Sequence, residues 1–155
     1  MRNSYLEVVR LTERLHRQFL EVVKSELDRG NTEDINNVQA LILFNIGEDE
    51  LTVGELTNRG YYLGSNVSYN VRKMVENNYL IQERSQHDRR STHVRLSEKG
   101  LALRLRIEKM FDRQIDALSQ VIPLAELQAS TSVYHRLEKF WIDLLAYDPR
   151  TSSGG

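Results

Sequence analysis

The feature that most constrains the fold is the stretch from Leu63 to Asn78, which has the pattern of an amphipathic helix. Its apolar residues recur at spacings of three and four, so they share one helical face that must pack on a core: Leu63, Val67, Val71, Met74 and Val75. The opposite face is mostly uncharged-polar and cationic, with a single acid: Ser65, Asn66, Tyr69, Arg72, Lys73 and Glu76. Such a face is typical of a helix that enters a polar groove.

A β-hairpin pattern follows this helix. Asn78 suits the left-handed conformation that ends a helix, and Tyr79 to Ile81 begin a strand. Thr92 to Leu96 alternate polar and apolar residues, as a return strand does. Between the two strands lies the polar, basic stretch Ser85 to Ser91. Helix, strand, basic tip and strand, in this order, indicate a winged helix-turn-helix.

The hairpin also carries a family resemblance. Residues 88–100 fit the pattern D-x-R-x-x-x-V-x-L-[ST]-x-x-G. This pattern resembles the wing signature of the MarR family of bacterial transcriptional regulators, and matching elements extend from about Tyr5 to Tyr147. Residues 53–80 most resemble the alphaproteobacterial branch that includes the PetP and LdtR regulators. The sequence departs from the family pattern at Asn70, where an apolar residue is usual.

The fold class that follows is mainly α with a small two-stranded β-wing, a winged helix-turn-helix with long terminal dimerisation helices. We expect one domain over residues 1–155, with dimerisation helices at about 1–30 and 98–147, the DNA-binding region at about 34–97 and a flexible tail at 148–155. Thr32 or Asp34 is predicted to cap the helix at 35–46, and Thr52 with Glu55 has capping-box spacing. Ser97 is predicted to cap the helix after the wing.

Composition excludes several classes of protein. There is no cysteine, which excludes disulfides, thiolate metal sites and cysteine-based sensing. The sequence shows neither a long apolar run nor a signal-peptide core, so we expect a soluble, cytoplasmic protein. The net charge is −1, but residues 84–106 carry seven Lys or Arg against two acids, while residues 26–55 carry eight acids against one Arg. Because phosphate responds to local charge, the basic segment is the predicted DNA-binding part.

The polar face of the recognition-type helix supplies the candidate base contacts. Arg72 and Lys73 are donors suited to guanine or phosphate, and Asn66 can pair with adenine. Ser65 and Ser68 can meet phosphate near the start of the helix, and Tyr69 lies opposite the apolar stripe. Alone, such a face is more often an ordinary solvated surface; the adjoining wing favours DNA.

At the wing, the resemblance implies that Arg90 enters the minor groove and that Asp88 holds it by an ion pair. A guanidinium is attracted to narrow, A·T-rich minor grooves, which agrees with this role. Arg84 and Arg89 are predicted to meet phosphates. Asp88 also suits a purely turn-forming role, and the two roles are compatible.

The resemblance further implies a homodimer that binds double-stranded DNA and a small anionic or aromatic effector. By this analogy His16, Phe44, Asn45 and Tyr61 are pocket candidates, although an exposed His, a core Phe44 and a Tyr61 packed under the turn are the plainer alternatives. The last helix has an apolar seam suited to the dimer interface, including Phe140, Trp141 and Leu144.

Two other functions have less support in the sequence. An enzyme has little support, because the common catalytic motifs are missing and Glu48-Asp49-Glu50 has the character of a solvated loop; we expect no cofactor and no metal. A winged-helix protein–protein adaptor without DNA readout is the main alternative, although it has no need of a basic tip. The sequence therefore predicts a homodimeric regulator of a pseudo-palindromic operator, a repressor, with activation as the other outcome.

Overall fold

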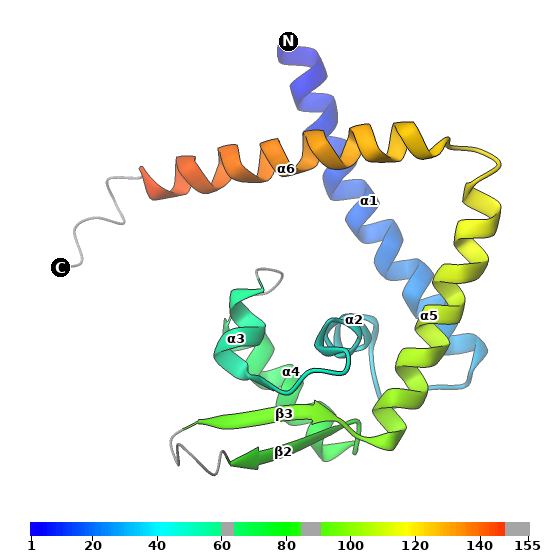
Figure 1. Ribbon diagram of the computed structural model, residues 1–155, viewed down its shortest axis with the longest axis vertical. Helices are drawn as coiled ribbons and strands as arrows, with labels where there is room; N and C mark the ends of the chain where they lie inside the picture. Colours follow the sequence, from blue (N-terminus) through cyan, green and yellow to red (C-terminus); the bar gives the residue numbers. More distant parts are fainter. Residues whose placement is uncertain (60–63, 85–90, 148–155) are drawn as a thin grey trace. The chain divides into compact units, whose positions relative to one another are not determined.

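The computed structural model of the chain describes residues 1–59, 64–84 and 91–147 (Figure 1). The chain forms two compact units, Met1–Met110 and Phe111–Gly155. Its elements are, in chain order, α1 (Arg2–Arg29), α2 (Asn37–Ile46), β1 (Leu51–Thr52), α3 (Val53–Asn58), α4 (Gly64–Glu76), β2 (Leu80–Arg84), β3 (Thr92–Leu96), α5 (Glu98–Leu118) and α6 (Leu124–Ala146). This order confirms a mainly α chain that contains a β-hairpin.

The core of the first unit lies where the short helices meet the sheet. Helices α2, α3 and α4 contact one another or the sheet and cover the same side of the hairpin (Figure 1). The largest fully buried side chains come from α1 to α5 and β3: Val23, Ile42, Leu43, Ile46, Leu56, Val67, Met74, Val94 and Ile107. Burial of these apolar surfaces is the main force that holds the unit together.

The central helix, α2, begins later than its sequence pattern predicts. Its N-cap is Asn36, whose side chain accepts from Gln39 N, while the Gln39 side chain accepts from Asn36 N. The prediction of Thr32 or Asp34 as the cap is therefore wrong. Asp34 is instead bonded to groups that are distant in sequence, Tyr79 and Lys99.

The sheet has three antiparallel strands in the order β1-β3-β2, one more than the predicted two-stranded wing. Leu80 pairs with Leu96 across the hairpin, and Leu51 pairs with Val94 on the other edge. Strand β1 has two residues, which is too short to show the alternation that reveals a strand. Leu51 is buried, so the apolar contact of this residue brings β1 onto the sheet.

Helix α4 buries three of the five residues of the predicted stripe, of which Leu63 lies outside the described residues. Val67, Val71 and Met74 are buried, whereas Val75 is only half-buried. Asn70, the departure from the family pattern, is also buried and accepts a hydrogen bond from Gln39. The helix is followed by Asn78 with a φ of 65°, the left-handed conformation predicted for this residue.

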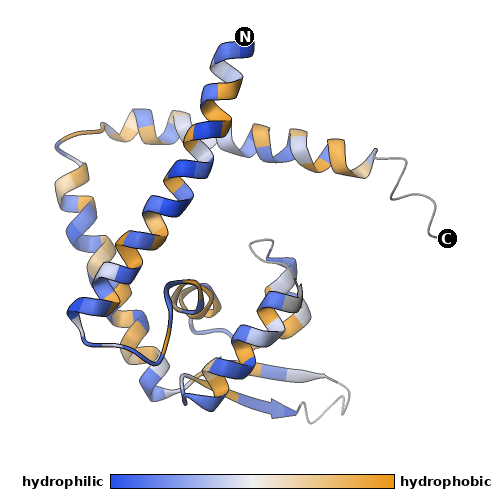
Figure 2. Ribbon diagram, turned by 180° about the vertical axis from the view of Figure 1, so that it is seen from behind, coloured by the Kyte–Doolittle hydropathy of each residue, from blue (hydrophilic) through white to orange (hydrophobic). Residues whose placement is uncertain are grey.

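The second unit contains the end of α5 and the whole of α6. No residue of α6 is buried, although hydrophobic residues recur along the helix (Figure 2). Its large exposed side chains include Leu124, Leu127, Val133, Tyr134, Phe140, Ile142, Leu144 and Leu145. Within the described part of the chain, no helix is long and apolar enough to cross a membrane.

Candidate nucleic-acid interface

The predicted DNA-reading face of α4 is open to solvent. Asn66, Ser68, Tyr69 and Arg72 are exposed, and Lys73 is half-buried. The side chain of Ser65 lies outside what the structure describes.

The two cations of α4 differ in their surroundings. Lys73 Nζ lies 3.3 Å from Glu76 Oε2 and 6.0 Å from the centre of the Tyr69 ring. Arg72 has no ion-pair partner among the described residues. Arg72 is therefore the cation of this face that is ready to meet an anion, while Lys73 is already partly neutralised by Glu76.

The helix before the turn, α3, is fixed at both ends. Thr52 Oγ1 accepts from Glu55 N at 3.0 Å, and a Glu55 carboxylate oxygen accepts from Thr52 N at 3.4 Å, which confirms the predicted capping box. After the helix, Arg59 donates to the carbonyl oxygen of Asn45 at 2.9 Å and to Asp49 Oδ2 at 3.0 Å. These contacts hold the chain in place as it enters the turn before α4.

At the wing, the structure describes the strands but not the tip. Arg84 ends β2 and is exposed, and its side chain has no partner among the described residues. Asp88, Arg89 and Arg90 lie outside the described residues, as does Tyr61. The roles predicted for these residues therefore stay predictions.

Residues 84–106 offer less free positive charge than their seven cations suggest, because four of these cations are bonded to other groups of the protein. Arg95 pairs with Glu83 and Glu50, and Lys99 pairs with Asp34. The other two are Arg104, which pairs with Glu48 and Glu108, and Arg106, which donates to Thr32 Oγ1 and to the carbonyl oxygen of Glu26. Of the seven cations, only Arg84, Arg89 and Arg90 therefore lack a partner that the structure shows, and the last two lie outside the described residues.

The acidic run Glu48-Asp49-Glu50 is exposed, yet each acid meets an arginine from a different part of the unit. Glu48 lies 3.8 Å from Arg104 of α5, and Asp49 lies 3.0 Å from Arg59 after α3. Glu50 lies 3.9 Å from Arg95 of β3. Exposed pairs contribute little individually, about 0–1 kcal/mol each, but together they tie one loop to three elements.

Two ionisable groups with shifted pKa values meet beside the segment that joins α4 to β2: Tyr79 belongs to this segment, and Asp34 lies before α2. Asp34 Oδ1 accepts from the Tyr79 hydroxyl at 2.5 Å, and Asp34 Oδ2 accepts from Lys99 Nζ at 2.5 Å. The hydrogen bond from Lys99, followed by that from Tyr79, lowers the pKa of Asp34 below its ordinary value. Burial, reinforced by the bond to Asp34, raises the pKa of the Tyr79 hydroxyl.

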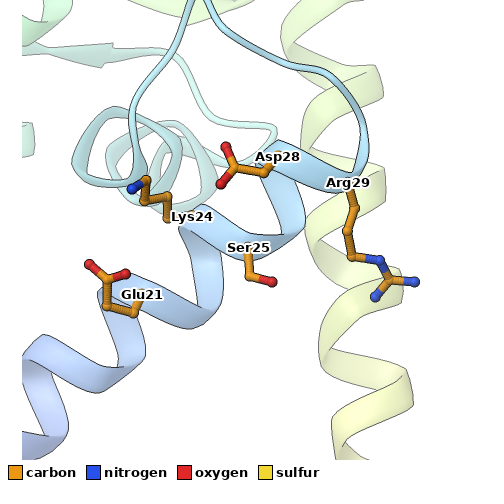
Figure 3. Close-up of a pocket in the computed structure, with 5 residues that line it drawn as sticks. All are labelled: Glu21, Lys24, Ser25, Asp28 and Arg29. Atoms are coloured by element: carbon orange, nitrogen blue, oxygen red, sulfur yellow. The ribbon is translucent and has the colours of Figure 1, made fainter.

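The predicted effector residues have different environments. His16 is exposed on α1, and Phe44 is half-buried with the Arg104 guanidinium 5.9 Å from its ring centre. Asn45 uses its carbonyl oxygen to accept from Arg59. A pocket of about 360 Å³ has none of them in its lining, which consists of Glu21, Lys24, Ser25, Asp28 and Arg29. Figure 3 shows that all five come from α1 and that their polar ends do not converge on one point.

The structure also bears on metal binding and on the residues of the predicted dimer interface. Among the described residues, no group of three or more His, Asp or Glu side chains is placed to hold a metal ion. Phe140 and Leu144 are exposed on α6, and Trp141 is half-buried.

Comparison with known proteins identifies the family. A sequence model of the MarR family matches residues 33–91. The exopolysaccharide II synthesis transcriptional activator ExpG of Rhizobium meliloti is 37% identical over 147 residues, which cover 93% of this chain and 75% of ExpG. This chain belongs to the MarR family. The finer placement of this MarR-family protein in the PetP/LdtR-type branch stays a prediction.

Solved structures of regulators share the fold. FabT from Streptococcus pneumoniae, solved in complex with DNA, has a TM-score of 0.74 at 17% identity, covering 90% of this chain and 99% of FabT. PcaV from Streptomyces coelicolor, solved in complex with its natural ligand, has a TM-score of 0.68 at 18% identity, covering 83% of this chain and 89% of PcaV. These likenesses show the winged-helix fold, and the family match with the identity to ExpG shows that the chain is a transcriptional regulator.

Proposed function

We propose that this MarR-family regulator is a homodimer that binds a pseudo-palindromic operator through α4 and the β2–β3 wing. The observation that carries the proposal is the exposed face of α4, with Arg72 unpaired within the described part of the chain, on a helix whose other face is buried. A helix held in this way can enter the major groove, where base edges are read by hydrogen bonds. Such a regulator meets its operator in the cytoplasm, where we place it.

The proposed contacts lie in the two grooves of the DNA. Arg72, Lys73 and Asn66 read base edges or meet phosphates in the major groove, with Ser65, Ser68 and Tyr69 beside them. Arg90, held by Asp88, enters the minor groove, and Arg84 and Arg89 meet flanking phosphates. Phosphate contacts place the protein on the duplex, whereas base contacts select the sequence.

Dimerisation is supported by the apolar surface that one chain leaves uncovered. Phe140 is 51% exposed and Leu144 is 55% exposed on a helix without a buried residue. Leu11 and Leu15 of α1 are also exposed. Apolar faces of this length are normally covered, and a second copy provides the matching surface.

The direction of regulation has two candidates. Repression is the outcome that the sequence predicts, and it results where a bound dimer blocks polymerase. The similarity to ExpG, a protein named as a transcriptional activator, favours activation. In vitro transcription from a promoter that contains the selected operator distinguishes them, because the added protein lowers the transcript yield in the first case and raises it in the second.

We also propose control by a small anionic or aromatic effector. The ligand complex of PcaV, a protein of the same fold, supports the idea. A ligand acts only if it binds one dimer state more tightly than the other, so it must shift the spacing of the two recognition helices. Operator affinity measured in the presence of a panel of benzoates and phenols tests this. At least one compound should change the affinity. If none does, the protein is not regulated by an effector of this class.

The experiment that tests the main proposal is selection of bound fragments from a random or genomic DNA pool. We expect one palindromic motif with half-sites about ten base pairs apart, and affinity that falls steeply with salt. Arg90→Ala should lower operator affinity by about 1–3 kcal/mol. Unenriched DNA, together with weak binding at low salt, would favour the protein–protein adaptor instead.

A further inference from the structure

The turn between α4 and β2, residues Asn77–Tyr79, is held from two directions. From the start of α5, Ser97 Oγ donates to the carbonyl oxygen of Asn78 at 2.6 Å, and Ser97 N donates to the carbonyl oxygen of Tyr79 at 3.0 Å. From the segment before α2, the carbonyl oxygen of Asp34 accepts from Asn77 Nδ2 at 2.9 Å, and its carboxylate accepts from the Tyr79 hydroxyl. The turn is therefore clamped between two distant parts of the chain.

Lys99 connects the two sides of this clamp. Its ammonium donates to Asp34 Oδ2 at 2.5 Å and to the carbonyl oxygen of Asn77 at 2.9 Å. It also lies 4.3 Å from the centre of the Tyr79 ring. One side chain in the first turn of α5 thus contacts both Asp34 and the turn.

The backbone leaves little freedom at this junction. A Cβ atom on Gly100 would lie 2.3 Å from the carbonyl oxygen of Tyr79, so α5 and the turn are in close contact. Asn78 has a φ of 65°, which fixes the direction of the chain as it leaves α4. The turn must move together with the start of α5.

The position of this clamp matters for reading two grooves at once. Helix α4 ends at Glu76 and β2 begins at Leu80, so only three residues separate the helix from the wing. The angle between them is set in this turn. A small error in this angle would place either α4 or the wing correctly, but not both.

We propose that Asp34 and Lys99 are positioning residues for operator recognition, which act through the turn Asn77–Tyr79 without contacting DNA. The inference rests on the function proposed above. Loss of the clamp lowers the affinity for the operator but spares the affinity for unrelated DNA, because the latter depends on phosphate contacts alone. The ratio of the two affinities is therefore the informative quantity.

The decisive variant is Asp34→Asn, because charge and positioning predict opposite effects. Removal of an acid favours DNA binding, so affinity for unrelated DNA should stay the same or rise. The clamp predicts instead that operator affinity falls about tenfold. Lys99→Met and Tyr79→Phe should lower the ratio as well, the latter without any change of charge at neutral pH. The double variant Asp34→Asn with Lys99→Met should lower it by less than the product of the single effects.

The matched control is Glu33→Gln, which removes the same charge from the neighbouring exposed residue, a residue without an ion pair in the described part of the chain. It should leave the affinity ratio unchanged. All variants are assayed well below their unfolding temperatures, and Tyr79→Phe provides the mildest change if a charge variant folds poorly.

Two results would overturn the inference. One is an affinity ratio equal to that of the wild type in Asp34→Asn, Lys99→Met and Tyr79→Phe, with only the unfolding temperature lowered. The other is an equal loss for operator and unrelated DNA in Lys99→Met, which would make Lys99 a phosphate contact. Failure of the proposed function looks different, because the wild type itself then shows no operator preference.

Discussion

The side-chain amide of Gln39 donates from Nε2 to Asn70 Oδ1 at 3.2 Å, and both residues are buried. The other end of the same amide accepts from Asn36 N at 3.0 Å and completes the capping box of α2. A short polar chain therefore runs from the first turn of α2 to the inner face of α4. It explains how α4 accommodates a polar residue within its apolar stripe.

Replacement of Asn70 by alanine should destabilise the protein by about 1–3 kcal/mol, because the buried amide of Gln39 loses its acceptor. Urea unfolding measures the change. Ser68→Ala, an exposed position on the same helix, is the control and should stay within about 0.5 kcal/mol of the wild type. Equal stability of Asn70→Ala and the control would mean that water satisfies Gln39.

Gly100→Ala should destabilise the first unit by about 1–3 kcal/mol, because its methyl group meets the backbone oxygen of Tyr79, which cannot move aside as a flexible side chain can. The matched control is Gly54→Ala in α3, where a Cβ atom would come no closer than 3.8 Å to Thr52 Oγ1. That change should be neutral or stabilise by up to about 1 kcal/mol. Thermal unfolding that ranks the two variants the other way would contradict the close packing at Gly100.

Thr52→Ala removes the side-chain acceptor of the capping box and should cost about 1 kcal/mol of stability. Thr57→Ala in the same helix is the control, because the Thr57 hydroxyl only donates back to the carbonyl oxygen of Val53. Its loss should be smaller than that of Thr52→Ala in chemical denaturation. Equal losses would show that α3 is held by packing rather than by its cap.

The lowered pKa of Asp34 predicts a pH dependence on the acid side. Its folded pKa lies below the unfolded value, so its contribution is fully present above about pH 4 and is lost as the pH falls through the folded pKa. Solvent screens part of this contribution, since the side chains of Asp34 and Lys99 are 44% and 45% exposed. Stability measured from pH 6 to pH 2 should therefore fall less in Asp34→Asn than in the wild type. Parallel curves would contradict the assignment.

Arg72→Ala should lower operator affinity by about 1–3 kcal/mol if Arg72 contacts a base. A phosphate contact would instead weaken binding to all sequences and reduce the salt slope by about one. Lys109→Ala, an exposed cation of α5, controls for the loss of charge and should change neither quantity appreciably. Unchanged binding in Arg72→Ala would remove this residue from the interface.

Local patterns predicted much of the fold because caps and stripes depend on neighbours in sequence. Strand β3 has the bounds that its alternation predicts, Asn78 adopts the left-handed conformation, and Ser97 Oγ accepts from Gly100 N at the start of α5. The sequence also placed the polar face of α4 opposite its buried stripe. The roles of that face, of the wing tip and of the dimer and effector residues stay predictions.

Long-range partners could not be predicted in the same way. Asp34 suits an N-cap by its type and place, but it bonds instead to Tyr79 and Lys99, which lie 45 and 65 positions away. Strand β1 forms because its two residues pair with the free edge of β3. Two residues are too few to show the alternation that predicts a strand. The positive charge of residues 84–106 includes the cations at 95, 99, 104 and 106, yet each of these has a partner within the fold.

The sequence by itself thus determined the helices, the caps at Thr52 and Ser97 and the family resemblance, because periodicity and capping act over a few residues. Only the tertiary structure decided which charges remain free, which polar residue is buried and what clamps the turn between α4 and the wing. Those outcomes depend on which side chains that are distant in sequence come into contact. The type of a side chain restricts the kinds of group that it can bind, but it does not specify which residue supplies that group.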